Sequence, residues 1–366
     1  MPQPHDSQHM RHALSLASRG LGSTWPNPSV GALVLKENVI VGVGVTARGG
    51  RPHAETQALA MAGGKAQGAT LYVTLEPCAH HGKTPPCTEG IIASGIARVV
   101  AACGDPNPKI AGKGFEQLRA AGIEVEQGIC EREALALNEG FFSVITRNRP
   151  FITLKTATSL DGKITDADGG SKWITGEDSR LAVQVLRASQ DAILTGIGTV
   201  LADDPQLTCR LPGREADSPQ RIVLDSHLRI SAQARILPAW IFTGSKTLAD
   251  EKDKVFVLKK KGASLFAVSL DTVTHLSLTE ILAKLAQEGI TRLLVEAGGT
   301  LAGELVRQNL VDRLYWFRAP LVIGNKGMPA LRSQDPLSLS ALPRYSLQGM
   351  ERFGSDVLEI YNCSPI

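Results

Sequence analysis

Long hydrophobic runs are missing from this 366-residue chain, and none approaches the roughly 18 apolar residues that a membrane-spanning helix requires. The first 25 residues also lack a basic segment followed by an apolar stretch, which is the pattern of a secretory signal peptide. We therefore expect a cytoplasmic protein. The remaining composition, 43% hydrophobic and 20% charged residues, is that of an ordinary globular chain.

The chain also lacks a large excess of charge of either sign, because its formal net charge is only +3. The run from Lys259 to Lys261 is short and typical of a solvated turn, and no basic segment is interleaved with aromatic residues. These features argue against a nucleic-acid-binding protein. Six cysteines are too few and too scattered for a disulfide framework in a chain of this length. In a reducing compartment, paired cysteines more often indicate a metal or catalytic site.

The length is about twice that of a typical domain, so we expect two domains. A polar, proline-containing segment at 147–150 separates two series of alternating strand and helix patterns, which predicts domains over residues 1–147 and 148–366. In the first domain, strands are predicted at 30–35, 39–45, 70–75, 98–102 and 123–127, and helices at 9–19, 52–62, 89–93, 114–121 and 131–142. In the second, strands are predicted at 151–157, 192–194, 221–224, 255–258 and 292–295, and helices at 178–188, 278–288 and 301–308. Both domains are predicted to be α/β layers.

The strongest chemical signal is a His-Ala-Glu triplet at 53–55, followed by Glu-Pro-Cys at 76–78 and by Cys87. One imidazole and two thiolates supply three zinc ligands and leave the fourth tetrahedral position to water, as in catalytic zinc sites. Zinc makes such a water far easier to deprotonate. Glu55 lies at the predicted start of a helix, where it can move protons without binding the metal. This donor set is that of the zinc nucleobase deaminases.

The spacing of the two cysteines departs from the general C-x-x-C pattern of those deaminases, because eight residues separate Cys78 from Cys87. Two alternatives follow. The thiols are simply buried and His53 is incidental, or His80 or His81 is a fourth ligand that closes a structural site. The order of histidine, glutamate and both cysteines favours the catalytic interpretation. The other four cysteines are expected to be core or surface thiols.

In several segments the chain resembles the bifunctional riboflavin-biosynthesis deaminase/reductases, the RibD or RibG family. In the first half the resemblance rests on Pro-Asn-Pro-Ser-Val-Gly at 26–31, the triplet at 53–55, the segment 76–87 and Asp-Pro-Asn-Pro at 105–108. It continues through Lys155, Ser-Leu-Asp-Gly at 159–162, Trp-Ile-Thr at 173–175, Ala-Asp-Asp-Pro at 202–205 and Val-Glu-Ala-Gly at 295–298. The long loop between the cysteines is usual in this family.

The resemblance implies a cytidine-deaminase-like domain followed by a dihydrofolate-reductase-like domain, assembled as a homodimer or homotetramer. It implies hydrolytic deamination of 2,5-diamino-6-ribosylamino-4(3H)-pyrimidinone 5′-phosphate. NADPH-dependent reduction of the ribosyl group of 5-amino-6-(5-phosphoribosylamino)uracil to ribityl then follows. By the same resemblance, His53, Cys78 and Cys87 hold one zinc ion, and Glu55 is the proton shuttle.

The resemblance also implies the sites for substrates and cofactor. Deaminase substrate contacts are implied at Asn27, Lys83, Asp105 and Asn107. An NADP site is implied at Ala157, Trp173, Thr199, Asp203, Ser226, Gly298, Gly299, Thr300, Leu301, Ala302, Gly303 and Glu304. A reductase substrate site is implied at Ser171, Arg187, Leu207, Arg210 and Glu296, and Lys155, Asp203 and Glu296 are candidates for positioning and proton supply. Thr46 stands where several family members carry a histidine, a departure that concerns one phosphate or ribose contact and not the chemistry.

The residues of the second half say less by themselves. No G-x-G-x-x-G follows a predicted strand, which argues against a conventional Rossmann domain. Residues 298–303 follow the predicted strand 292–295 and open a helix, so their N–H groups and the helix dipole can hold a phosphate. A tight strand-to-helix turn explains the same glycines equally well. Arg187 and Arg210 suit a sugar phosphate, although each alone is also consistent with surface charge.

Two other classes of function compete with a bifunctional metabolic enzyme. A polynucleotide-editing deaminase is disfavoured by the small net charge and the lack of an aromatic and basic stripe. A scaffold with a structural zinc predicts that Glu55→Gln keeps the fold, the metal and all function.

Overall fold

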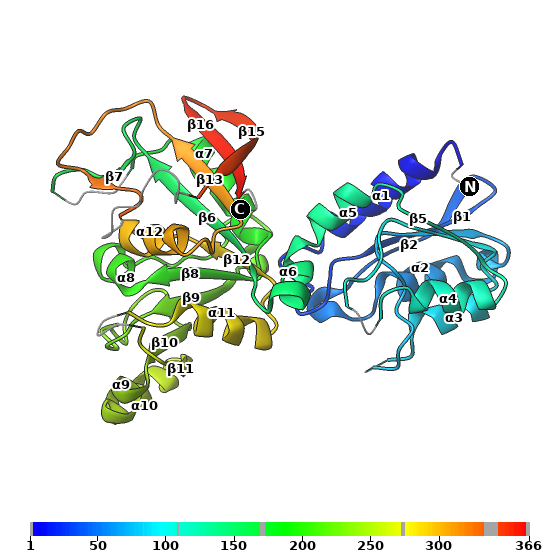
Figure 1. The fold of residues 1–366 in the computed structure, drawn as a ribbon, viewed down its shortest axis with the longest axis horizontal. Coiled ribbons are helices and arrows are strands. Elements are labelled where there is room, and N and C mark those ends of the chain that lie inside the picture. Colours follow the sequence, from blue (N-terminus) through cyan, green and yellow to red (C-terminus); the bar gives the residue numbers. More distant parts are fainter. Residues whose placement is uncertain are drawn as a thin grey trace. The chain divides into compact units, whose positions relative to one another are not determined.

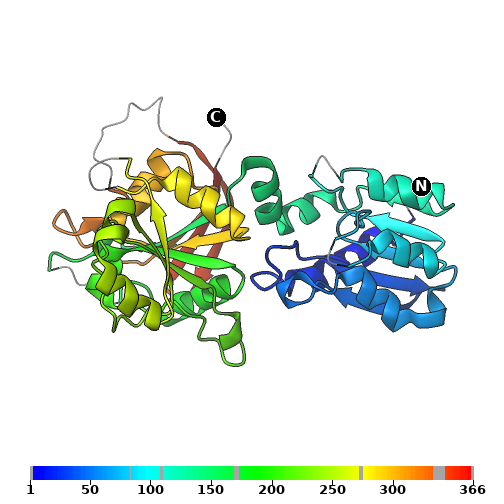
Figure 2. The ribbon, with the colours of Figure 1, turned by 90° about the horizontal axis from the view of Figure 1, so that it is seen from below.

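The computed structural model describes residues 3–82, 84–107, 110–168, 173–271, 275–332 and 343–363. The chain divides into two compact units, Met1–Arg149 and Pro150–Ile366, each built on its own main sheet (Figure 1 and Figure 2). Within the described residues, no helix is both long and apolar enough to cross a membrane.

The first unit has a five-stranded sheet in the order β2-β1-β3-β4-β5. Its strands are β1 (Gly31–Lys36), β2 (Val39–Val45), β3 (Thr70–Val73), β4 (Arg98–Ala101) and β5 (Glu124–Gln127). Strand β1 is antiparallel to β2 and β3, whereas β3, β4 and β5 are parallel. Because parallel strands end at the same edge of a sheet, the segments that leave β3 and β4 start side by side.

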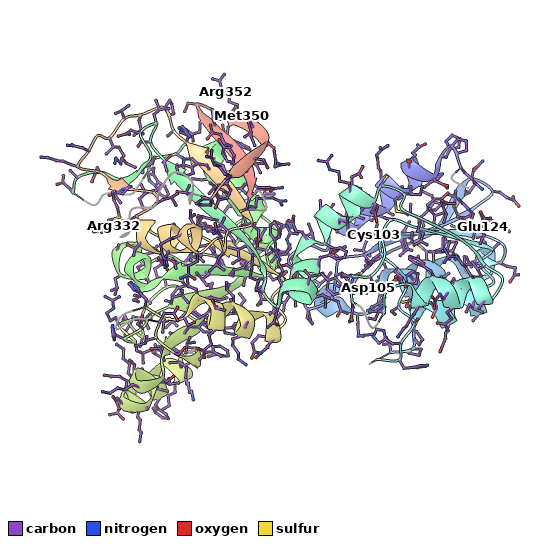
Figure 3. The ribbon with its side chains drawn as sticks, in the orientation of Figure 1. Cys103, Asp105, Glu124, Arg332, Met350 and Arg352 are labelled. Carbon is purple, nitrogen blue, oxygen red and sulfur yellow. The ribbon has the colours of Figure 1, made fainter. Side chains whose placement is uncertain are left out.

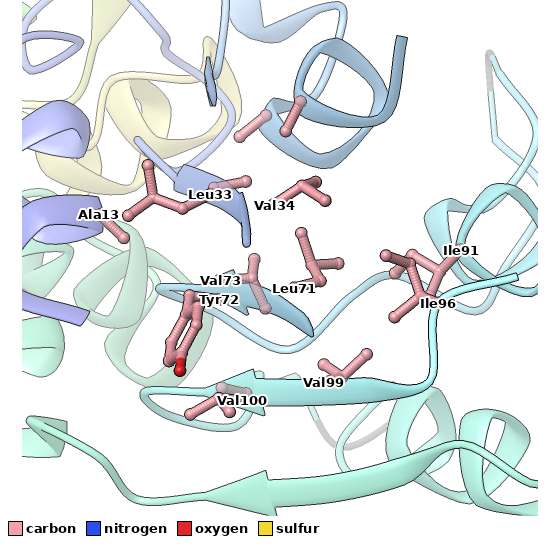
Figure 4. Packing of buried hydrophobic residues seen from close by; sticks show 14 of the residues in the cluster. Ala13, Leu33, Val34, Leu71, Tyr72, Val73, Ile91, Ile96, Val99 and Val100 are labelled. Carbon is pink, nitrogen blue, oxygen red and sulfur yellow. The ribbon is translucent and has the colours of Figure 1, made fainter. Parts of the chain in front are cut away.

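The α-helices in the described part of this unit are α1 (Asp6–Ser18), α2 (Ala54–Ala62), α3 (Cys87–Ala93), α4 (Lys113–Ala120), α5 (Glu131–Leu137) and α6 (Glu139–Arg147). Figure 1 shows α1 and α5 on one face of the sheet, and α2, α3 and α4 on the other. The core fills both interfaces, with Leu33, Tyr72 and Val100 on the α1 face and Leu71 and Val99 on the opposite face (Figure 4).

Glycine in the first two strands allows the helices to approach closely. A Cβ on Gly44 would lie 2.0 Å from the carbonyl oxygen of Ala54 at the start of α2, and a Cβ on Gly31 would lie 2.0 Å from that of Ala13 in α1. A side chain at Gly44 is therefore excluded. Since Ala54 stands between His53 and Glu55, this packing fixes the end of α2 that carries both residues.

A buried polar network connects α1 to the sheet. Arg98 donates two hydrogen bonds of 3.0 and 2.9 Å to the Asp6 carboxylate, and the Tyr72 hydroxyl donates a third of 2.8 Å. Burial raises the pKa of Asp6, but the bonds from Arg98, Gln3 and Tyr72 outweigh it and lower that pKa to about 2. Nothing in the sequence pattern pointed to this network.

The predicted strands of the first unit are confirmed with ends that differ by at most two residues, and its predicted helices with ends that differ by at most three, except for the single helix predicted at 131–142. Residues 131–142 are not one helix: α5 and α6 meet at Asn138, whose amide group exchanges two 3.0 Å hydrogen bonds with the backbone of Ser29. Helix α2 begins at Ala54 rather than Pro52, with His53 as its N-cap.

The second unit has a nine-stranded sheet in the order β11-β10-β9-β8-β12-β6-β13-β16-β15. Its strands are β6 (Phe151–Thr158), β8 (Ala192–Gly196), β9 (Gln220–Leu224), β10 (Trp240–Gly244), β11 (Ser264–Val268), β12 (Arg292–Val295), β13 (Arg313–Arg318), β15 (Tyr345–Phe353) and β16 (Asp356–Cys363). All neighbours from β11 to β13 are parallel, and β16 and β15 complete the sheet as antiparallel strands. A small pair of strands, β7 (Lys163–Thr165) and β14 (Met328–Pro329), stands apart.

The helices of this unit are α7 (Glu177–Ala188), α8 (Ile197–Asp203), α9 (Ser245–Asp250), α10 (Lys252–Lys260), α11 (Leu278–Gln287) and α12 (Gly299–Arg307). Helices α8 and α9 begin immediately after β8 and β10, and α12 begins at Gly299, after the three residues 296–298 that follow β12. Their N-termini therefore gather at the carboxyl edge of the parallel strands, the edge at which open α/β sheets bind ligands.

The strand predicted at 255–258 is wrong, because these residues belong to α10. Only Leu258 of this helix is buried, while Phe256 and Val257 are exposed, so the apolar run reflected a one-sided helix. Strands β10, β11, β13, β15 and β16 were not predicted. The longest, β15, is an edge strand that buries none of its residues fully, and its sequence does not show a core-facing period.

Candidate zinc and cofactor sites

Three segments of the first unit bring one imidazole and two thiols together. His53 is the N-cap of α2, Cys78 lies in the loop after β3, and Cys87 is the first residue of α3. The His53 Nδ1 atom lies 3.3 Å from Cys87 Sγ and 3.7 Å from Cys78 Sγ. Zinc bonds of about 2.0 Å to nitrogen and about 2.3 Å to sulfur, at the tetrahedral angle, place the two donors about 3.5 Å apart. The three side chains therefore fit a zinc ion.

The electrostatics of this cluster favour the metal-binding form of the cysteine. A hydrogen bond from the Cys87 thiol, together with the neighbouring His53 imidazole, lowers the pKa of Cys78 to about 4 against the opposing effect of burial. The backbone N–H of Cys87 donates to Cys78 Sγ over 3.3 Å and adds to this effect. The thiolate is the form of cysteine that binds zinc, so the lowered pKa keeps Cys78 in its metal-binding form.

Glu55 lies in the first turn of α2 and its side chain is only 4% exposed. Burial raises the pKa of this carboxyl. A raised pKa makes the carboxyl a better proton acceptor while it can still release the proton later, which is what a general acid–base group requires. The predicted placement of Glu55 at the start of a helix, beside the ligand set, is confirmed.

Neither histidine of the loop between the cysteines joins the cluster. His81 is exposed and its Nε2 atom pairs with Glu89 Oε1 at 2.9 Å, and His80 is exposed as well. In the described part of the chain, the side chains grouped for a metal are His53, Cys78 and Cys87. The closed structural site with His80 or His81 as fourth ligand is therefore not formed.

Glu76, two residues before Cys78, anchors a second loop to the cluster. Its carboxylate accepts three backbone hydrogen bonds, from the N–H groups of Asp105 (3.1 Å), Gly112 (3.0 Å) and Gly114 (2.9 Å). The side chain is only 4% exposed. Sequence reasoning treated Glu76 only as part of a motif and missed this role, because its partners lie 29 to 38 positions away.

The candidate substrate contacts of this unit lie on segments joined to the ligand-bearing ones. Asn27 Nδ2 donates to the carbonyl oxygen of Gly50, three residues before His53, over 2.8 Å. Asp105 follows β4 (Figure 3), and its Oδ1 atom accepts a 2.8 Å bond from the N–H of Asn107. Burial raises the pKa of Asp105. Lys83 lies outside the described residues.

The side-chain hydroxyl of Thr46 forms its hydrogen bond with the protein backbone. Its Oγ1 atom accepts a 2.9 Å hydrogen bond from the N–H of Val30, and the side chain is buried. The hydroxyl is therefore committed to fixing the end of β2.

In the second unit, a buried ion cluster joins three of the predicted residues. Glu296, just after β12, receives two hydrogen bonds from Arg187 of α7, of 2.7 Å from Nε and 3.1 Å from Nη2. Lys155 of β6 lies 3.7 Å from the same carboxylate. Burial opposes ionisation of Glu296, but the charges of Arg187 and Lys155 outweigh it and lower its pKa to about 2. Burial lowers the pKa of Lys155, so its ammonium gives up a proton more readily than an exposed lysine does.

Arg210 lies close enough to this cluster for the charge of Arg187 to affect its pKa. Burial lowers the pKa of Arg210, and the positive charge of Arg187 adds to that effect. Its backbone N–H is fixed by a 2.9 Å bond to Gln184 Oε1 of α7. Leu207, nearby in sequence, is buried and adopts a left-handed φ of 51°. Ser171 lies outside the described residues.

The glycine-rich start of α12 meets the start of α8. A Cβ on Gly298 would lie 3.8 Å from Thr199 Oγ1, and a Cβ on Gly196 would lie 3.6 Å from a Leu301 methyl group. Gly298 is the N-cap of α12, and neither it nor Gly299 has a positive φ. A turn that demands glycine is therefore not the reason for these residues.

Close packing explains two of the glycines in α12. A Cβ on Gly299 would lie 2.3 Å from the carbonyl oxygen of Pro329, and one on Gly303 would lie 2.3 Å from that of Arg332. The N–H of Arg332 also donates a 2.8 Å bond to the carbonyl of Gly299. These two glycines allow the end of β14 and the residues that follow it to lie against the helix, a role that the sequence analysis did not consider.

The remaining cofactor candidates are spread over several elements. Trp173 is 70% exposed and stacks against the Arg180 guanidinium, 4.5 Å from the ring centroid. Glu304 pairs with Arg307. Ala157 belongs to β6, Asp203 ends α8, and Ser226 follows β9, where its carbonyl oxygen accepts hydrogen bonds from Gly244 and Thr247. Thr300 and Ala302 lie in the first turns of α12.

Two protein families match the two units. The family described as the cytidine and deoxycytidylate deaminase zinc-binding region matches residues 3–103, and the RibD C-terminal domain family matches residues 150–358. The first unit is thus a cytidine-deaminase-like domain, and the second is a RibD reductase domain with a dihydrofolate-reductase-like fold.

Known proteins resemble the chain over most of its length. The riboflavin biosynthesis protein RibD of Aquifex aeolicus is 47% identical over 319 residues, which covers 87% of this chain and 88% of that protein. Among solved structures, form 1 of Acinetobacter baumannii RibD matches with a TM-score of 0.88 and 37% identity over 99% of both chains. A Thermotoga maritima diaminohydroxyphosphoribosylaminopyrimidine deaminase/5-amino-6-(5-phosphoribosylamino)uracil reductase matches with a TM-score of 0.85 and 37% identity, over 98% of this chain and 99% of that one. The chain therefore belongs to the RibD family, the bifunctional deaminase/reductases of riboflavin biosynthesis.

Proposed function

We propose that the two units catalyse two successive steps on one ribotide. The unit over residues 1–147 hydrolyses the amine of 2,5-diamino-6-ribosylamino-4(3H)-pyrimidinone 5′-phosphate. The unit over residues 148–366 then uses NADPH to reduce the ribosyl group of 5-amino-6-(5-phosphoribosylamino)uracil to ribityl. The observation that carries the proposal is the group of His53, Cys78 and Cys87 with the buried Glu55 beside it.

In the deaminase, we propose that His53, Cys78 and Cys87 hold one zinc ion, which supplies the Lewis acidity that makes water a nucleophile at neutral pH. Glu55 takes the proton of the attacking water and delivers it to the ring nitrogen. The proton of the newly added hydroxyl then passes through Glu55 to the amine, the carbon–nitrogen bond breaks, and ammonia leaves as the carbonyl forms. The raised pKa of Glu55 suits a carboxyl that must both accept and donate a proton.

Substrate contacts complete the deaminase site. Asn27, Asp105 and Asn107 present amide and carboxylate groups to the pyrimidine edge, and Lys83 is assigned to the phosphate. Glu76 is a positioning residue, since its three backbone bonds hold the segment that carries Asp105.

In the reductase, we propose that NADPH, the hydride source, binds at the carboxyl edge of the sheet. Its contacts are Ala157, Trp173, Thr199, Asp203, Ser226, Gly298, Gly299, Thr300, Leu301, Ala302, Gly303 and Glu304. Substrate contacts are Ser171, Arg187, Leu207, Arg210 and Glu296. The hydride reaches the sugar carbon that bears the amine, in the open-chain imine form of the substrate.

The ion cluster gives the reductase its proton chemistry. Glu296 holds Arg187 through two hydrogen bonds and lies beside Lys155. We propose Lys155, Asp203 and Glu296 as the residues that position the sugar and supply the proton, and the lowered pKa of the buried Lys155 supports a part in proton supply. Arg187 and Arg210 together suit the phosphate. We further propose a homodimer or homotetramer in the cytoplasm.

A two-stage incubation tests the proposal. Purified, zinc-loaded protein is mixed with the diaminopyrimidine ribotide, and ammonia is measured; NADPH is then added, and its absorbance at about 340 nm is followed. We expect ammonia without NADPH and cofactor oxidation only after deamination. Absence of ammonia from zinc-loaded protein contradicts the first activity, and absence of NADPH oxidation on the authentic uracil ribotide contradicts the second.

A further inference from the structure

Arg51 connects the two segments that carry the zinc ligands. It lies two residues before His53, and its guanidinium Nη1 donates a hydrogen bond to the Thr84 hydroxyl, three residues before Cys87. A Cβ on Gly82 would lie 3.5 Å from Arg51 Nη2, so the guanidinium also lies against the middle of the loop between the cysteines. The guanidinium is therefore held against the loop that joins the two cysteine ligands.

Within the part of the chain that the structure describes, no carboxylate pairs with Arg51, and its side-chain hydrogen bond goes to the neutral hydroxyl of Thr84. The side chain is half-buried, so solvent screens it only in part. A guanidinium has five N–H donors. The bond to Thr84 occupies one of them, and the others remain for an anion.

We propose that Arg51 binds the 5′-phosphate of the deaminase substrate, a contact that none of the residues assigned above includes. The inference rests on the proposed function, which gives the first reaction a ribotide and proposes that its phosphate is bound by Lys83, a residue of the loop between Cys78 and Cys87. Guanidinium groups bind phosphate through parallel hydrogen bonds as well as charge. Arg51 thereby makes the site selective for the phosphorylated substrate over the free nucleoside.

The simplest competing explanation is that Arg51 only fastens the loop through Thr84. Two variants separate these explanations. Arg51→Gln removes the charge, whereas Thr84→Val removes the hydrogen bond and leaves the charge. If Arg51 acts on the phosphate, only the first variant changes selectivity; if it acts on the loop, the two variants behave alike.

The test compares deamination of the ribotide with deamination of the same compound without its phosphate. For Arg51→Gln we expect kcat/KM on the ribotide to fall about 10- to 100-fold, the usual effect of losing a charge-assisted hydrogen bond. The change should lie in KM, because the phosphate is remote from the reacting carbon. On the dephosphorylated compound, wild type, Arg51→Gln and Thr84→Val should agree within about 3-fold.

Controls keep the outcomes distinct. Zinc content and reduction of the uracil ribotide, measured on every variant, report whether the chain is folded. If Arg51→Gln loses zinc, the test is made with Arg51→Lys instead. For that variant we expect a smaller fall in kcat/KM, and only on the ribotide. Equal losses on both compounds, no loss on the ribotide, or a Thr84→Val variant that matches Arg51→Gln overturns the proposal. Failure of the zinc-loaded wild type to deaminate the ribotide overturns the proposed function, and the Arg51 proposal falls with it.

Discussion

Replacement of Glu76 by glutamine should loosen the segment that carries Asp105 while leaving the zinc ligands in place. The carboxylate accepts three backbone hydrogen bonds, one at Oε1 and two at Oε2. A glutamine presents one oxygen and one N–H₂ group, so at least one of the three N–H groups loses its acceptor. A buried donor without a partner costs about 1–3 kcal/mol. Local opening of this segment should therefore be about 10- to 100-fold more frequent.

Hydrogen exchange measures this opening directly. Mass spectrometry of peptides that contain Asp105, Gly112 and Gly114 should show their amides exchanging about 10- to 100-fold faster in Glu76→Gln than in wild type. The KM of deamination should rise, with zinc content unchanged, because the segment carries a proposed substrate contact. Glu116→Gln is the matched control, since Glu116 is an exposed carboxylate nearby in the chain. Unchanged exchange in Glu76→Gln, or equal acceleration in the control, would refute the reasoning.

Three further predictions concern other parts of the chain. Glu55→Gln should keep zinc but lower deaminase kcat by about 10²–10⁴ while uracil-ribotide reduction survives; loss of zinc in parallel would assign Glu55 to the metal instead. Asp6, with a pKa lowered from 3.8 to about 2, contributes about 2 kcal/mol above pH 4 that is lost as the pH falls toward 2. In urea unfolding, the stability gap between wild type and Asp6→Asn should therefore narrow across that range, and a constant gap contradicts the Arg98 pairing. Gly303→Ala should weaken NADPH binding in fluorescence titrations, because its Cβ would lie 2.3 Å from the Arg332 carbonyl oxygen; wild-type affinity would show that the packing yields easily.

The chemistry of the zinc cluster was readable from the sequence because it depends on residue identity and order. His53, Glu55, Cys78 and Cys87 are diagnostic before any distance is known. Their convergence was not readable, because it depends on β3 ending beside β4 and on the close approach of α2 to Gly44. Both are contacts between distant segments.

The errors of the sequence analysis have the same origin. Residues 131–137 are mostly good helix formers, but Asn138 and Gly140 are not, and the hydrogen bonds between Asn138 and Ser29 fix the position of the break. The segment 255–258 has strand-forming residues, but one-sided burial makes it part of α10. In both segments, contacts with other parts of the chain decide a structure that local preference alone does not.

The glycines of α12 illustrate a different limit. Residues 298–303 suggested a phosphate-binding turn or a tight turn, yet Gly299 and Gly303 are required where backbone of the 329–332 segment lies against the helix. A glycine in a sequence signals that a side chain is excluded, but the excluding group is visible only in the fold.

X-ray absorption at the zinc edge tests the central claim most directly, with elemental analysis for stoichiometry. We predict one zinc per chain, with two sulfur neighbours at about 2.3 Å and two nitrogen or oxygen neighbours at about 2.0 Å, of which a single one is an imidazole. Cys78→Ser should lose both the metal and deamination. A second imidazole in the spectrum, or full deaminase turnover by a zinc-free protein, would contradict the account of the amino-terminal unit.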